Sequence, residues 1–159
     1  MATTPGAIRD AFIDGITGIA PALHPQQRFK VHREELPFRD WAEKNASACL
    51  RRFSVRFTGN TEPPLVNDLL VQEVQDIAEV IVAYPTDWRH GGDQLAGLDN
   101  VIDLDGVKIE RTIGPPGYAT TAGLVAPCTV LWQQANERES LGAVTLLIIR
   151  YRVDYTRAL

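Results

Sequence analysis

Hydrophobic and polar residues are arranged most distinctively in the last stretch of the chain. Residues 144–149 are apolar or β-branched and carry no charge. In residues 150–155, charged and apolar side chains alternate. The charged positions are Arg150, Arg152 and Asp154, and the apolar positions are Tyr151, Val153 and Tyr155. Because side chains alternate between the two faces of a strand, this pattern predicts a strand that is buried on both faces in its first half and on one face in its second half.

Four other segments have patterns typical of strands. Residues 51–58 alternate clearly, with Phe53, Val55 and Phe57 on one face and Arg52, Ser54, Arg56 and Thr58 on the other. Residues 26–33 predict a short strand with one face in water. Residues 101–113 predict strand structure with a turn at Asp105 and Gly106. Residues 128–134 predict a strand that pairs with the terminal strand as an antiparallel hairpin, with a polar tip at residues 136–140.

Two segments have the spacing of amphipathic helices. The first covers residues 5–19, where Thr4 supplies an N-cap hydroxyl and Pro5 fits the first turn. Its apolar positions recur at helical spacing: Ile8, Phe12, Ile16 and Ile19. The second covers residues 63–84, and its apolar stripe is Leu70, Val74, Ile77, Ile81 and Tyr84. The outer side of this second helix would be acidic, with Asp68, Glu73, Asp76 and Glu79.

The remaining segments are expected to be loops. Residues 36–41 predict a loop or turn that carries two aromatic anchors, and residues 88–100 and 114–126 predict irregular loops. Short connections between neighbouring elements favour antiparallel pairing. The chain is therefore expected to form one α+β domain over residues 1–159, with a mainly antiparallel or mixed sheet of about five strands packed with two principal helices.

Composition narrows the functional class. The chain has 159 residues and a formal net charge of −4, whereas general binders of the DNA backbone are usually basic. Arginine is favoured over lysine, with thirteen arginines and three lysines. Such a bias is typical of protein interfaces, and equally of a GC-rich genome. Cys49 and Cys128 match no metal or redox spacing, which favours buried thiols in a reducing compartment. With neither a secretory signal nor a long apolar run in view, we expect a soluble protein made inside a cell.

No motif for catalysis, phosphate binding or metal binding is present in the sequence. We therefore expect no enzyme, no cofactor and no metal site. One alternative remains open, a small ligand-binding or enzymatic α+β domain whose pocket would use His90, Asp93 and Tyr118. A second alternative is a nucleic-acid-binding module with arginines and aromatic residues on one sheet face.

The arginines suggest a surface for assembly. Arg52 and Arg56 share one strand face, and Arg150 and Arg152 share another, beside Tyr151. These residues could meet acidic groups of a neighbouring subunit, for which the candidates are Glu73, Asp76 and Glu79. The alternative is that all of these charges are simply solvated, as is usual for exposed strand and helix faces.

The order of elements resembles that of the tail-terminator and neck (head–tail completion) proteins of long-tailed bacteriophages. The shared pattern is an amphipathic N-terminal helix, a strand at residues 51–57, a long helix introduced by proline at residues 63–84, a middle rich in loops, and an apolar terminal strand ending in tyrosine. The resemblance implies a ring, usually hexameric, that caps the completed tail tube or sheath and meets the head connector.

A ring of this kind would be a structural part of the virion, made in the host cytoplasm, with DNA only passing through its pore and no membrane contact. A head-to-tail ring also needs two different and complementary surfaces on each subunit. The sequence does not separate a tail terminator from a head-completion (stopper) connector protein, which stays the alternative within the same class.

Overall fold

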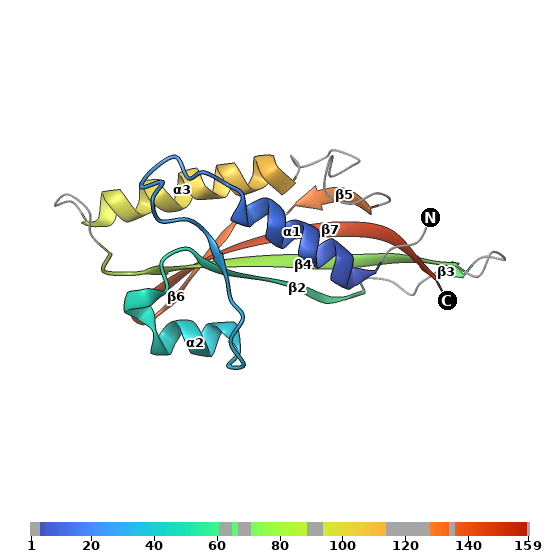
Figure 1. Cartoon of the computed structure of the whole chain (residues 1–159), viewed down its shortest axis with the longest axis horizontal. Helices are drawn as coiled ribbons and strands as arrows, with labels where there is room; N and C mark the ends of the chain where they lie inside the picture. Colours follow the sequence, from blue (N-terminus) through green and yellow to red (C-terminus); the bar gives the residue numbers. More distant parts are fainter. Residues whose placement is uncertain are drawn as a thin grey trace.

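The structure is a computed structural model that describes residues 4–60, 65–66, 71–88, 94–113, 128–133 and 136–158. Its centre is a mixed β-sheet in which five strands follow one another in the order β1-β2-β4-β7-β5 (Figure 1). These strands are β1 (Lys30–Val31), β2 (Arg52–Asn60), β4 (Val71–Pro85), β7 (Val144–Ala158) and β5 (Cys128–Gln133). Two further strands pair with this path, β3 (Leu65–Val66) with β4 and β6 (Glu137–Leu141) with β7. Among the described strands, only the β1–β2 pair is parallel, and the other pairs are antiparallel.

Three helices pack on this sheet: α1 (Pro5–Thr17), α2 (Phe38–Lys44) and α3 (Gln94–Ile113). A short 3₁₀ turn follows α2 at Ala46–Ala48. In Figure 1, α1 and α3 lie on one face of the sheet and α2 lies on the other. The expected α+β class, with a mixed sheet of about five strands, is thus confirmed.

The terminal strand β7 lies in the middle of the sheet and pairs with β4, β5 and β6. It pairs with β4 along its whole length, from Val144 opposite Pro85 to Ala158 opposite Val71. Leu147 and Ile149 pack under α1 and α3, whereas Leu146 and Ile148 pack under α2. Beyond Ile149 only every second residue is buried. The prediction of a strand buried first on both faces and then on one is therefore confirmed.

The larger core lies between the sheet and the helices α1 and α3. Helix α1 begins as expected, because Thr4 accepts a hydrogen bond from the backbone N–H of Ala7 at 3.1 Å and Pro5 occupies the first turn. Its buried residues are Ile8, Phe12, Ile13 and Ile16. They meet β2 residues such as Phe53 and β7 residues such as Tyr151 within one hydrophobic cluster.

On the other face of the sheet, the described residues form a second, smaller core at one end. Helix α2 packs there through Phe38 and Ala42 against Ile81 and Ile148. This segment was expected to be a loop, but Phe38, Trp41 and Ala42 stand at helical spacing and place apolar side chains on one side. Beyond α2, the neighbouring residues on this face of the sheet are charged: Arg56, Glu79 and Arg150.

The prediction of a helix over residues 63–84 is wrong. Within the described residues, this region contains β3 and β4. Six of the fifteen residues of β4 are β-branched, and β-branched side chains favour strands. From Val74 to Tyr84 the even-numbered positions face the large core, which is the period of two expected for a strand. The same segment also has apolar residues at helical spacing, which led to the prediction of a helix. Long-range pairing with β7 decides between the two periods.

The strand expected over residues 101–113 is also wrong, because these residues belong to the 20-residue helix α3. Its buried positions have helical spacing: Leu98, Val101, Ile102, Asp105, Ile109 and Ile113. Residues 94–100, expected to be part of a loop, form the start of this helix. Gly106 lies within α3 and not in a turn. A Cβ at this position would lie 3.3 Å from the Asn136 side chain and 3.7 Å from that of Leu147, so the lack of a side chain lets α3 pack closely against the sheet.

The hairpin before the C-terminus differs from expectation in its tip. Residues 136–140 are not a polar tip, since β6 itself pairs with the first half of β7. The chain reverses at Gly142, whose φ of 60° suits glycine. Strand β5 pairs antiparallel with the second half of β7, as predicted. The predicted strand 26–33 is reduced to β1, and the predicted loop 114–126 lies outside the described residues.

Candidate assembly interface

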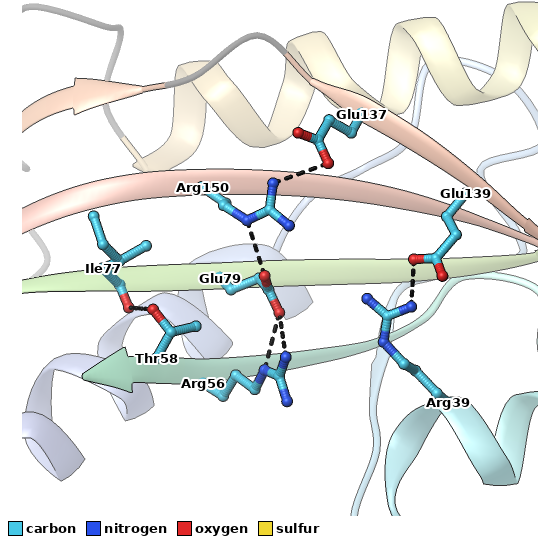
Figure 2. A network of polar contacts seen from close by, with 8 residues as sticks. All are labelled: Arg39, Arg56, Thr58, Ile77, Glu79, Glu137, Glu139 and Arg150. Atoms are coloured by element: carbon cyan, nitrogen blue, oxygen red, sulfur yellow. Dashed lines mark hydrogen bonds and ion pairs between the residues drawn. The ribbon is translucent and has the colours of Figure 1, made fainter.

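A row of four alternating charges crosses the open part of the α2-side sheet face (Figure 2). It consists of Arg56 on β2, Glu79 on β4, Arg150 on β7 and Glu137 on β6. The sheet register places Glu79 directly between Arg56 and Arg150. We call these four residues the charge row, and they form a continuous polar band beside the end of the sheet that α2 covers.

The centre of the charge row is tightly paired within the chain. Glu79 is buried and accepts hydrogen bonds from the Nε atoms of Arg56 and Arg150, at 2.9 and 3.0 Å. Arg150 also forms an ion pair of 2.9 Å with Glu137. Hydrogen bonding to Glu137, and then to Glu79, raises the pKa of Arg150 above its usual value. Glu79 is thus occupied by arginines of its own chain, and its presentation to a neighbour is limited.

The other arginines and the tyrosine expected at the interface have different surroundings. Arg52 lies over the ring of Trp41, with its guanidinium carbon 4.8 Å from the ring centre. Arg152 donates to Asp154 on the same strand at 3.3 Å. Tyr151 belongs to the core, where its ring meets that of Phe12 edge-on at 5.9 Å. The period-two pattern of β7 turns Tyr151 away from the face that carries the arginines.

The expected acidic residues are split between the two sheet faces. Glu73 is exposed on the same face as Glu79, whereas Asp76 is buried on the helix-covered face. Asp76 accepts hydrogen bonds from the backbone N–H groups of Gly59 and Ile77, at 3.1 and 2.8 Å. Burial raises the pKa of Asp76. The acidic side of the expected helix therefore does not exist as one surface.

The edge of β2 supplies a feature that the sequence did not indicate. Strand β1 pairs with β2 only at Arg52 and Phe53, so within the described part of the chain the edge beyond Phe53 has no strand beside it. The carbonyl of Phe53 points toward β1, where it accepts from the His32 N–H at 2.8 Å. Because backbone groups alternate in direction, Val55 also directs its N–H and carbonyl outward.

A groove of about 440 Å³ runs along this edge. Its charged lining comes from three elements: Arg9 of α1, Arg39 and Asp40 of α2, and Arg56 of β2. Arg39 pairs with Glu139 of β6, as Figure 2 shows, and Arg56 pairs with Glu79. Arg9 is exposed at the groove. We call this surface the β2 groove. It combines three arginines and one carboxylate with a strand edge that is unpaired among the described residues.

The opposite flank of the sheet has another character. There the outward side of α3 carries two carboxylates, Asp99 and Asp103, which both bind Arg138 of β6 at 2.7 and 2.5 Å. Next to them Leu104 and Val107 are exposed, at 39% and 40%. This α3 flank thus sets two carboxylates against one arginine, beside two exposed apolar side chains, so the two flanks of one subunit are chemically unlike.

Sequence reasoning missed a buried polar cluster under α3. Arg51, Tyr84 and Asp105 are all fully buried and linked, with Asp105 accepting from both of the other side chains. The signal lay in Asp105, which occupies a core position of α3 and is visible once residues 98–113 are recognised as a helix. Cys49 is buried as expected, and burial raises the pKa of its thiol to about 11.

The described residues contain no cluster of metal-binding side chains. Among the described residues, no group of three His, Cys, Asp or Glu side chains could hold a metal ion. His90, Asp93 and Tyr118, the expected pocket residues, lie outside the described residues, as does the side chain of Cys128. Nor is any helix in the described ranges both long and apolar enough to span a membrane.

Comparison with known proteins adds no family. A scan against models of protein families finds no match to this chain, and a search of curated protein sequences finds no significant relative.

Proposed function

We propose that this protein is a structural subunit that assembles head-to-tail into a ring, and specifically the tail terminator of a long-tailed bacteriophage. The ring, of about six copies in the resembling family, would close the head-proximal end of the tail tube or sheath and meet the head connector. DNA would pass through its pore, and neither catalysis nor a cofactor would be needed. The protein would then be a component of the virion.

The observation that carries this proposal is the difference between the two flanks of the sheet. The β2 groove offers the exposed side chain of Arg9 and a strand edge that no other described strand covers. The α3 flank offers Asp99 and Asp103 beside the exposed side chains of Leu104 and Val107. Head-to-tail contacts join two different patches, and repetition of such a contact closes a ring. Opposite charge on the patches favours the correct register of neighbouring copies.

The resemblance to tail terminators retains three of its elements. Helix α1, strand β2 and the terminal strand β7 follow the family's order, and two long helices, α1 and α3, lie together on one face of the sheet. The long helix of the resemblance is absent at residues 71–84, which form β4. The proposal therefore rests more on the two unlike flanks than on the order of elements.

The experiment compares assembly of the wild-type protein with that of an Arg9→Glu variant by mass photometry. Arg9 is exposed and projects from α1 at the β2 groove, so reversal of its charge is expected to reduce assembly at least about tenfold in apparent affinity. The melting temperature should stay unchanged, since exposed substitutions have small effects on stability.

A Lys44→Glu variant is the matched control. Lys44 is also an exposed cation in a helix, but it lies in the last turn of α2 and does not line the β2 groove. It should assemble like the wild type. Equal assembly of all three proteins would show that the β2 groove is not part of the interface.

A further inference from the structure

A second hollow, of about 330 Å³, lies where β1 meets β2. It is lined by the segment before β1, by the 3₁₀ turn after α2, by the start of β2 and by Trp88. Its cationic residues are Arg28, Lys30 and Arg52, and its neutral polar residues include Gln27 and Ser47. We call it the basic hollow, because no carboxylate is among its lining residues.

Local geometry brings the three cations to one side. Lys30 stands directly opposite Arg52 in the parallel β1–β2 register, so that their side chains share a sheet face. In the segment leading into β1, Arg28 and Lys30 are exposed while Phe29 between them is buried. Like charges directly opposite each other on a sheet repel, so the pairing of Lys30 with Arg52 is electrostatically unfavourable unless an anion lies near them.

The charges of the basic hollow also lack the compensation found elsewhere in this protein. Arg56 and Arg150 each have a carboxylate partner within the chain. By contrast, Arg28 donates to the carbonyl of Gly18 at 3.1 Å, and Arg52 lies over Trp41. Within the ranges that the structure describes, neither of these two arginines nor Lys30 forms an ion pair. The hollow therefore concentrates three positive charges in a protein whose formal net charge is −4.

We propose that the basic hollow binds a phosphate group. A phosphate oxyanion would relieve the repulsion among the three cations, and guanidinium groups match its geometry with paired hydrogen bonds. The hydroxyl of Ser47 and the amide of Gln27 add neutral donors at the same wall. Trp88 also lines the hollow, where its half-buried ring meets that of His24 edge-on at 5.0 Å.

The phosphate can be presented by a free mononucleotide or by the backbone of a nucleic acid, and the two sources share the same chemistry at the hollow. This site is separate from the β2 groove, whose lining shares no residue with it. The inference consequently does not depend on the proposed function, and it can hold for a monomer as well as for a ring.

The experiment is calorimetric titration of the purified protein at low salt with three probes: inorganic phosphate, adenosine monophosphate and a short DNA duplex. The wild-type protein is expected to bind at least one of them saturably. Lys30→Glu is expected to weaken that binding at least about tenfold, because it replaces the central cation with an anion. Lys30 is exposed, so the variant should fold, and its melting temperature checks this directly. Lys30→Met, which only removes the charge, should have a smaller effect in the same direction.

The pattern across the probes identifies the source of the phosphate. Binding of the mononucleotide favours a small ligand, whereas binding of the duplex alone, with a steep loss as salt rises, favours a nucleic-acid backbone. Lys44→Glu, which removes the same charge outside the hollow, should bind like the wild type. The proposal is overturned if no probe binds saturably, or if Lys30→Glu binds as tightly as the wild type.

Discussion

The guanidinium of Arg51 and the carboxylate of Asp105 form an ion pair that is completely shielded from solvent. Two hydrogen bonds of 2.7 and 2.9 Å join them. The remaining donors of Arg51 bind the backbone carbonyls of Leu23, His24 and Gln27 at 2.6 to 2.9 Å. One side chain thus ties helix α3 to the connection between α1 and β1, and its own backbone adopts a φ of 57°.

Breaking this pair should be costly. Asp105→Ala would leave the guanidinium of Arg51 buried without its anion, and removal of one partner of a buried ion pair typically costs about 3–5 kcal/mol. We expect a loss of that size in the free energy of unfolding, measured by urea denaturation. A loss below about 1 kcal/mol would mean that the pair contributes little beyond what solvent can replace.

Two buried tyrosines offer a matched comparison. The hydroxyl of Tyr84 donates to Asp105 at 2.8 Å, whereas the buried hydroxyl of Tyr151 has no hydrogen-bond partner in the part of the chain that the structure describes. Tyr84→Phe should therefore destabilise the fold by about 1–2 kcal/mol, because it removes a hydrogen bond to a buried charge. Tyr151→Phe should be neutral or stabilising, since it removes a buried polar group that gains nothing from the fold. Thermal melts of both variants test this, and the opposite order would refute the assignment.

Stability should depend on pH through Asp76. Burial raises its pKa in the folded state above the ordinary value of 3.8, so ionisation costs more in the folded than in the unfolded chain. Its contribution to stability is therefore greatest below pH 3.8 and is lost as the pH rises through the folded-state pKa. Asp76→Asn cannot ionise, and its free energy of unfolding should gain on the wild type as the pH rises from about 3.5 to 7. A difference that stays constant over this range would contradict the prediction.

Arg150 should behave as a structural residue of the subunit. Arg150→Glu would set a third carboxylate beside the buried Glu79 and the nearby Glu137. We expect a loss of about 2–4 kcal/mol in the free energy of unfolding, because like charges replace a partly buried ion pair. Arg152→Glu is the control, since among the described residues Arg152 pairs with Asp154 alone, and it is more exposed than Arg150. Equal stability of the two variants would show that the charge row adds nothing to the fold.

The sequence predicted those elements whose pattern has one explanation. Residues 144–155 and 51–58 alternate strictly, and Thr4 with Pro5 marks a helix start, so β7, β2 and α1 were correct. Residues 71–84 fit a helical stripe as well as a strand, and the choice depends on pairing with β7, which is more than sixty residues away. The prediction for residues 98–113 was wrong because Asp105 and Gly106 are typical turn residues, although here they lie in the middle of helix α3.

The candidate interface could be predicted only in composition. Arginines on the faces of β2 and β7 were identified, but their partner Glu79 was expected on a neighbour rather than on the strand between them. That relation follows from the strand order, in which β4 lies between β2 and β7. The β2 groove was invisible for the same reason, since Arg9, Arg39 and Arg56 come together only in the folded chain.

The central claim is that copies of this chain join through two unlike flanks into a closed ring. Negative-stain imaging of the purified wild-type protein, alone and with the tail-tube protein that the proposed function requires, tests this most directly. We expect rings with a central opening, and their disappearance in Arg9→Glu. Single subunits alone, at every concentration and with the partner present, would contradict the claim.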